Sequence, residues 1–236
     1  MNTIDKEDVD ITRLFFWNKK VEIFDTNEKS VLSVYMRVVG DNDIQQARAV
    51  ALRESAKFRQ KLKHDEDTRL AYIPFYEDFT NEELIAAILT LYAPEVTREA
   101  LREVDIPLPK EPKSDADLEV QEEYRKKVDE WPSLRRQKID EYIIKKLEGY
   151  EQIYKSYTKE QLASEHERVL ISEMCKDKMV STFRDYSIYL SIFADEKFTK
   201  RYFNSYEEFL NLPTAYKEQF VTAYDTLDID TDELKK

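Results

Sequence analysis

The side chains able to support nucleophilic or zinc chemistry are few in this chain. It has two histidines, His64 and His166, and one cysteine, Cys175. Two zinc ligands on one helical face lie about four residues apart, whereas nine residues separate His166 from Cys175. A cysteine nucleophile would need a histidine brought to it by tertiary folding. Cys175 follows Met174 in an apolar-patterned segment, so we expect a packed, inert thiol.

Carboxylates are abundant, but their spacing predicts no metal site. The segment 228–232 alternates aspartates as a calcium loop does, yet it lacks the central glycine, and its twelfth position would fall beyond Lys236. Neighbouring acids such as Glu82 and Glu83 do not face each other on a helix. We therefore expect no catalytic residue, no metal and no cofactor, and a protein that is not an enzyme. A divergent metal-dependent hydrolase built from scattered carboxylates stays an alternative.

Glycine is scarce in this sequence. Gly40 and Gly149 are the only two in 236 residues, where average usage of roughly 7% gives about sixteen. Phosphate loops and dinucleotide-binding turns need several glycines close together, and neither motif occurs. Hydrophobic residues make up 42% of the chain, enough for a packed core despite 36% charged residues. Because the net charge is −12 and phosphate binding requires cations, nucleic acid is not the expected partner.

The sequence also indicates where the protein works. It begins with the acidic stretch MNTIDKEDVD, which does not look like a secretory leader. No run of about eighteen apolar residues could span a membrane, and a single cysteine cannot form an internal disulfide. We expect a cytoplasmic protein without a membrane partner.

The first forty residues predict a β-hairpin. An apolar cluster containing Phe15, Phe16 and Trp17 comes first, followed by two β-like runs, 21–24 and 31–39, with a polar turn between them. Apolar and polar side chains alternate in the second run, the period of a half-buried strand. Helical patterns dominate the rest of the chain. The expected fold class is therefore mainly α with minor β, an N-terminal β-hairpin followed by a multi-helix bundle.

The helix expected after Gly40 has a basic face. Arg53, Lys57 and Lys61 follow one another at i, i+4 and i+8, so they lie on one side of the helix. This stripe is either a solvated helix face or a docking surface for nucleic acid, for an acidic protein, or for the acidic middle of this chain. A looser segment, residues 64–78, is expected to follow.

Three capping boxes predict later helix starts, at Thr80, Thr158 and Ser205. The first should open a helix through Leu91, with a shorter helix over 97–104. Beyond these, the aromatic residues recur at helical spacing, which favours a packed core, since base stacking would need basic neighbours. These aromatic residues are Phe183, Tyr186, Tyr189, Phe193, Phe198, Tyr202, Phe203, Tyr206, Phe209, Tyr216, Phe220 and Tyr224.

A proline-rich stretch, 106–113, marks the clearest internal boundary, because proline lacks an amide donor and pushes its predecessor into an extended conformation. A charged helix over 114–130 and another from Pro132 to about Tyr157 would then form a hairpin with its corner at Trp131. The expected organisation is a β-hairpin plus helices in 1–105, a connector in 106–113, a helical region in 114–228 and a polar tail in 229–236.

One resemblance to a known family rests on the N-terminal half. It is carried by the run VYMRVVGD at 34–41, by Ala47-Arg48 and Ala51-Leu52-Arg53, and by PKSD at 112–115. In these stretches the chain resembles tailed-bacteriophage tail assembly chaperones and related phage accessory proteins. The resemblance implies a helical protein that holds an aggregation-prone structural protein of the tail or tape-measure type. It implies a location in the host cytoplasm or on the virion. It assigns no catalytic residue.

The expected function is therefore protein binding in bacteriophage morphogenesis, as a tail assembly chaperone or a virion-associated accessory protein. Phe15, Phe16 and Trp17, with Arg53, Lys57 and Lys61, are the candidate partner-binding residues. The alternative from another class is a regulatory binder that docks nucleic acid or an acidic partner through the basic helix face. Self-association through the helices around 118–157 is also open.

Overall fold

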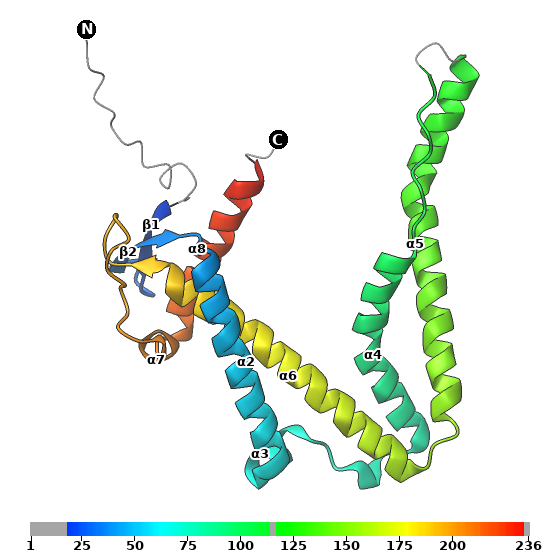
Figure 1. Cartoon of the computed structure of the whole chain (residues 1–236), viewed down its shortest axis with the longest axis horizontal. Coiled ribbons are helices and arrows are strands. Elements are labelled where there is room, and N and C mark those ends of the chain that lie inside the picture. The colour runs from blue at the N-terminus through cyan, green and yellow to red at the C-terminus, as the bar shows by residue number, and fades with distance from the viewer. Residues whose placement is uncertain (1–17, 114–116, 234–236) are drawn as a thin grey trace. The chain divides into compact units, whose positions relative to one another are not determined.

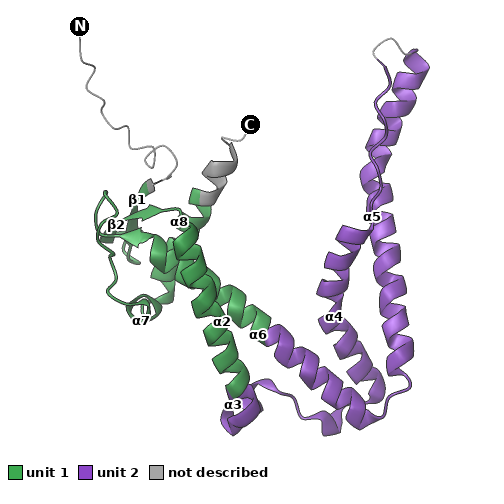
Figure 2. Ribbon diagram, in the orientation of Figure 1, with its two compact units in different colours: residues 1–60, 175–236 green, residues 61–174 purple. Residues whose placement is uncertain are grey.

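The chain folds into two compact units. The computed structural model describes residues 18–113 and 117–233, most of which are helical (Figure 1). Unit 1 combines residues 1–60 with 175–236, and unit 2 is the stretch 61–174 between them (Figure 2). The expected fold class is confirmed, since a small antiparallel sheet is followed by helices.

Unit 1 contains a three-stranded antiparallel sheet in the order β1-β2-β3. β1 is Asn18–Phe24 and β2 is Ser30–Arg37, so the predicted hairpin is confirmed. Asp25 stabilises the turn between them, because one oxygen of its carboxylate accepts hydrogen bonds from the backbone amides of Asn27 and Lys29. β3, Ile192–Phe193, pairs with β2 and was not predicted, because a strand of two residues shows no alternation in the sequence.

The inner face of the sheet covers an aromatic core. Val34 and Met36 of β2 are fully buried against α7 (Tyr206–Leu210) and α8 (Thr214–Glu233). α8 continues to Glu233, so helix extends into the segment 229–236 that the sequence predicted as a polar tail. Phe203, Phe209 and Phe220 are buried in this core, as expected, while Tyr186 and Phe193 are buried elsewhere in unit 1.

Two long helices complete unit 1. α2 is Asp41–His64, and the second half of α6 (Lys159–Ser191) packs against it. Ala51 is almost fully buried between them, and the Ser55 hydroxyl donates to the Cys175 carbonyl at 2.7 Å. Small side chains at these contacts let the two backbones approach closely.

Unit 2 begins with a short helix where the sequence suggested a looser segment. α3 is Glu66–Tyr72, and a single 3-10 turn, η1, follows at Tyr76–Asp78. The Asp65 side chain accepts from the Thr68 amide at 2.7 Å, which supplies the N-cap of α3. This cap was visible in the sequence, but too few apolar residues follow it to give a helical period.

α4 is one helix where the sequence predicted two. It spans Asn81–Glu103 and contains Pro94 in its interior. The capping box at its start is confirmed, with the Thr80 side chain accepting from the Glu83 amide and the Glu83 carboxylate accepting from the Thr80 amide. The other two predicted caps are also made: Thr158 and Gln161 bond reciprocally, and the Ser205 hydroxyl accepts from the Glu208 amide.

α5 corrects the largest error of the sequence prediction. It runs unbroken over Leu118–Tyr154, so Trp131 and Pro132 lie inside a helix and form no corner. The Trp131 indole nitrogen donates to the Ile106 carbonyl at 3.1 Å, and the Arg135 guanidinium lies 5.7 Å from the centroid of the Trp131 ring. These contacts lie on both sides of the proline. Pro132 has no amide proton for the carbonyl of residue 128, and at this exposed position water can bond that carbonyl instead.

The hairpin of unit 2 is therefore made by other elements. α4 and α5 pack side by side, and the helix-free stretch 104–113 runs back along α5 (Figure 1). The stretch 106–113 is a connector without helix, as predicted. It lies inside unit 2, whereas the boundaries of the compact units fall near residues 60 and 174.

A network of side-chain hydrogen bonds centred on Glu165 of α6 joins this helix to α4 and α5 in unit 2. Both Tyr92 and Tyr154 donate their hydroxyl protons to Glu165, at 2.9 and 3.2 Å. Arg168 donates to both oxygens of the same carboxylate, at 2.7 and 2.8 Å. These donors, with Arg168 the strongest contributor, lower the pKa of Glu165 to about 2. Burial is the main cause that raises the pKa of the Tyr154 hydroxyl.

Replacing Pro132 with Ala should stabilise the protein. The change restores one amide donor in α5 and removes the ring from a continuous helix, where proline costs up to about 3 kcal/mol relative to alanine. We expect a higher denaturation midpoint with unchanged helical circular dichroism. Pro107→Ala is the control, because Pro107 lies in the extended connector. Equal effects of the two changes would contradict a continuous α5.

Replacing Glu165 with Gln should destabilise the protein at neutral pH by about 1–3 kcal/mol, because Arg168 loses its charged partner. The folded-state pKa lies below the ordinary value, so the stabilisation is present above about pH 4.5 and is lost as the pH falls towards about 2. Urea titrations at several pH values should show this loss in the wild type and a weaker one in the variant. Glu148→Gln, at an exposed site on α5, should leave the pH dependence unchanged.

Candidate functional site

The predicted partner-binding residues divide into two groups. Phe15, Phe16 and Trp17 lie outside the described residues. Arg53, Lys57 and Lys61 are all exposed on α2, as a solvated face or a docking surface would require. Lys57 pairs with Glu54 at 2.7 Å, and an exposed pair of this kind contributes little stability. None of these three side chains belongs to the lining of the apolar hollow on the neighbouring side of α2.

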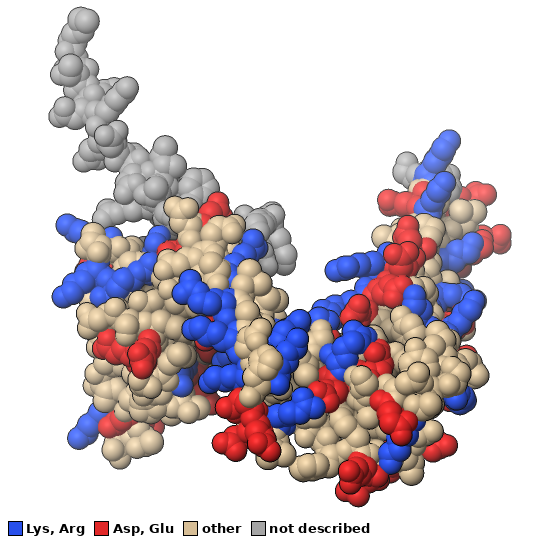
Figure 3. All heavy atoms as spheres, turned by 60° about the horizontal axis from the view of Figure 1, so that its bottom comes forward, with Lys and Arg blue, Asp and Glu red and all other residues tan. Residues whose placement is uncertain are grey.

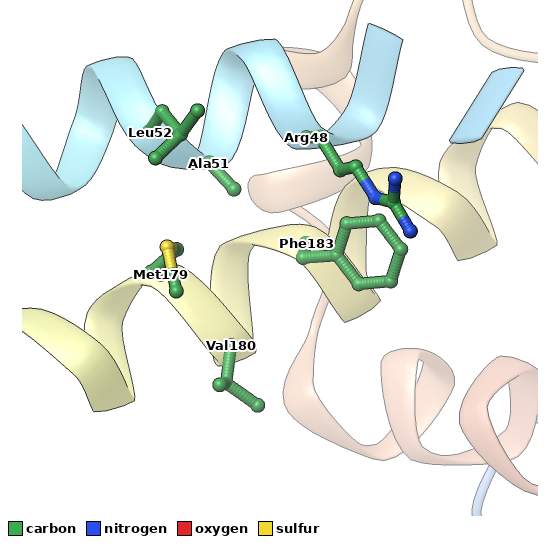
Figure 4. Close-up of a pocket in the computed structure, with 6 residues that line it drawn as sticks. All are labelled: Arg48, Ala51, Leu52, Met179, Val180 and Phe183. Carbon is green, nitrogen blue, oxygen red and sulfur yellow. The ribbon is translucent and has the colours of Figure 1, made fainter. Parts of the chain in front are cut away.

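A neighbouring side of α2 forms an apolar groove with α6. The groove has a volume of about 390 Å³, and its residues come from two successive turns of each helix (Figure 4). Its lining is almost entirely hydrocarbon, with a single charged side chain. The lining residues are Arg48, Ala51 and Leu52 from α2, and Met179, Val180 and Phe183 from α6.

The groove arises from the sizes of the side chains between the two helices. The small side chain of Ala51 lies at the bottom of the groove and leaves space above it. The hydrogen bond from Ser55 to the α6 backbone keeps the two helices close beside the groove. Leu52 and Val180 point away from this contact and are 60% and 62% exposed. Figure 4 shows the Phe183 ring near the Arg48 end of the hollow. Aliphatic side chains this exposed add little to folding and are available to a partner.

The charge around the groove comes mainly from α2. Its basic side chains, including Arg48, are exposed, and lysines and arginines gather near the middle of the face shown in Figure 3. Residues 41–63 carry six lysines and arginines against three acids, while residues 64–130 carry nineteen acids against eight bases. The groove thus offers apolar contact with a cation at its edge, in a chain that is acidic as a whole.

Other reactive side chains do not form a second site. His166 is buried, and its Nδ1 atom lies 3.0 Å from the Tyr76 hydroxyl. Burial lowers the pKa of His166, which favours the neutral ring. Cys175 is buried on the same helix, about 13 Å further along at the α-helical rise, so the thiol and this imidazole cannot exchange a proton directly.

Neither metal-binding clusters nor membrane-spanning segments occur in the part of the chain that the structure describes. No group of three or more His, Cys, Asp or Glu side chains there could hold a metal ion. No described helix is long and apolar enough to cross a membrane.

Comparisons with known proteins give no relative for this chain: no family model matches it, and neither the curated proteins nor the solved structures contain a significant match.

Sequence reasoning did not find the groove. It placed binding on the charged stripe, whereas the groove depends on Leu52 and Val180, two aliphatic residues beside the buried faces of their helices. The available signal was Leu52 itself, a leucine next to Arg53 on the polar side of an otherwise regular apolar pattern. Val180 gave no comparable signal, because α6 is apolar on several sides near its end.

Replacing Leu52 with Ala should change the free energy of unfolding by less than about 0.5 kcal/mol, since this side chain is mostly in water. Leu190→Ala in α6 is the matched control. Leu190 is 4% exposed, and its truncation should cost about 2–5 kcal/mol. Chemical denaturation measures both. A large loss at Leu52 would mean that this side chain supports the fold and is not reserved for a partner.

Proposed function

We propose that this protein is a non-enzymatic binding protein that holds a helix of another protein in the α2–α6 groove. The groove carries the proposal, because it is apolar, is bounded by two packed helices and keeps two aliphatic side chains exposed at its rim. Binding of an amphipathic helix in such a groove is a common mode of peptide recognition.

The groove also indicates the chemistry of the partner. Covering Leu52 and Val180 removes apolar surface from water, which contributes about 25 cal/mol per Å² buried. Arg48 at the edge can pair with a carboxylate of the incoming helix through charge-assisted hydrogen bonds. We therefore infer a helix with an apolar stripe and an acidic residue beside it.

The resemblance to tail assembly chaperones supports a more specific role. The partner would be a phage structural protein of the tail or tape-measure type, held in the host cytoplasm during morphogenesis or bound on the virion. A net charge of −12 would keep such a complex soluble while the groove covers apolar surface of the client. This role rests on the sequence resemblance and on the groove together.

The double variant Leu52→Glu with Val180→Glu tests the groove. The two glutamates would place carboxylates in an otherwise apolar contact, and the one at position 52 could also occupy Arg48, so the affinity for the client should fall at least tenfold, or about 1.4 kcal/mol. The measurement is co-expression with each tail and capsid protein, followed by titration of the partner recovered. Circular dichroism should be unchanged, because both positions are exposed.

A charge reversal at Arg53, Lys57 and Lys61 is the matched control on the same helix. Binding of the client should survive it, because these residues do not line the groove. If the reversal abolished binding and the groove variant kept it, the regulatory alternative with an acidic partner or nucleic acid would replace the proposal. Failure of every tail and capsid protein to bind the wild type would contradict the phage role.

A further inference from the structure

Among the residues that the structure describes, none pairs with the outer edge of β1 as a strand. β1 pairs there with β2 alone, and its other edge lies outside the described sheet. At one end of this edge, the Gln219 side-chain amide accepts from the Phe24 amide and donates to the Phe24 carbonyl, both at 2.9 Å. Gln219 thereby takes the place of a neighbouring strand for one residue.

The same edge presents further backbone groups. Peptide groups of alternate residues in a strand point the same way, so those of Lys20 and Glu22 face outward like those of Phe24. Among the residues that the structure describes, none hydrogen-bonds these outward groups of Lys20 and Glu22. An open edge of this kind is a template for pairing with another strand.

α8 leaves room beside this edge. A hollow of about 440 Å³ lies between β1 and α8, and four of its α8 residues are small: Ala215, Thr222, Ala223 and Thr226. Phe220 and Leu227 on another side of α8 enter the core, while Glu218 and Gln219 line the hollow together with the small residues. An incoming strand therefore meets free backbone groups at Lys20 and Glu22 and a helix face with small side chains on both sides of Glu218 and Gln219.

We propose that β1 pairs with β1 of a second copy of this chain, antiparallel about Val21, to form a continuous six-stranded sheet in a twofold-symmetric dimer. The register places Lys20 opposite Glu22 of the second copy, and Glu22 opposite its Lys20. Each of these is a hydrogen-bonded pair that exchanges both backbone bonds, and the two Val21 residues face each other at the twofold axis.

The charges of β1 favour a second copy over an unrelated strand. Lys20 and Glu22 lie on the outer face of the sheet, 53% and 43% exposed, and form an ion pair 3.3 Å long within the strand. In the proposed register each lysine also faces a glutamate of the other copy, so the strand is complementary to itself. Opposite charges on directly facing residues stabilise a strand pair, and like charges destabilise it.

The twofold axis brings the two copies of α8 together on the inner face of the sheet. Helices pack with their axes about 8–10 Å apart, and the smallest separations require small side chains at the contact. Thr222 and Thr226 meet this requirement towards the C-terminal part of α8, whereas Glu218 and Gln219 line the hollow closer to its start. The edge of β1 therefore carries the symmetric contact, which is separate from the α2–α6 groove.

The charges of Lys20 and Glu22 provide the test. Sedimentation velocity of the full chain should show a dimer at about 100 μM. Lys20→Glu or Glu22→Lys alone places like charges opposite each other at both pairs, and should weaken dimerisation at least tenfold. The double variant Lys20→Glu with Glu22→Lys restores opposite charges and should restore the dimer. Both substituted positions are exposed, so circular dichroism should stay unchanged in all three variants.

A cysteine at the twofold axis tests the register. Val21→Cys places two thiols in a non-hydrogen-bonded pair, close enough for a disulfide between copies on mild oxidation. Ile23→Cys, which faces Lys19 of the other copy, should not cross-link. A monomeric wild type would overturn the proposal and leave the edge to residues 1–17 or to another protein. A dimer that the charge variants leave intact, or that Val21→Cys does not cross-link, would overturn it equally.

Discussion

Burial of the end of α6 is the constraint on which unit 1 depends. Within a few residues, Tyr186 and Leu190 pack against α2, while Ile188 and Ile192 enter the core beneath the sheet. The chain then passes directly into β3, which pairs with β2. These few residues therefore position α2, supply the edge strand β3 and form one side of the aromatic core. The α2–α6 groove exists because this packing holds the two helices together while Leu52 and Val180 remain outside it.

Local signals in the sequence predicted the elements that local physics controls. The hairpin and the caps at Thr80, Thr158 and Ser205 follow from alternation and from side-chain bonds to nearby amides, so they were predictable. Pro132 was misread because its effect depends on tertiary contacts: the bond from Trp131 to Ile106 holds α5 straight through a residue that usually ends a helix. β3 is defined wholly by its pairing with β2 and has no local signature.

The candidate site shows the same division. Arg53, Lys57 and Lys61 were found because charge at helical spacing is visible in one dimension, and the structure places them in solvent. The lining residues of the groove on α2 and on α6 lie more than a hundred positions apart in the chain, so no short window of sequence contains both of its walls. A surface made of two aliphatic side chains and one arginine has no motif, and only the packing of α2 on α6 brings it together.

The interruption of unit 1 by unit 2 has a consequence for synthesis. Unit 2 is one continuous stretch, 61–174, and its contacts can form as soon as it leaves the ribosome, since domains fold as units from the N-terminal side. The hairpin emerges earlier, but the rings of Phe209 and Phe220 that cover Val34 emerge only after unit 2. A nascent chain that has emerged as far as residue 174 therefore carries the whole of unit 2 and an uncovered apolar hairpin. Until α7 and α8 emerge, that hairpin exposes apolar surface to the solvent and to other proteins.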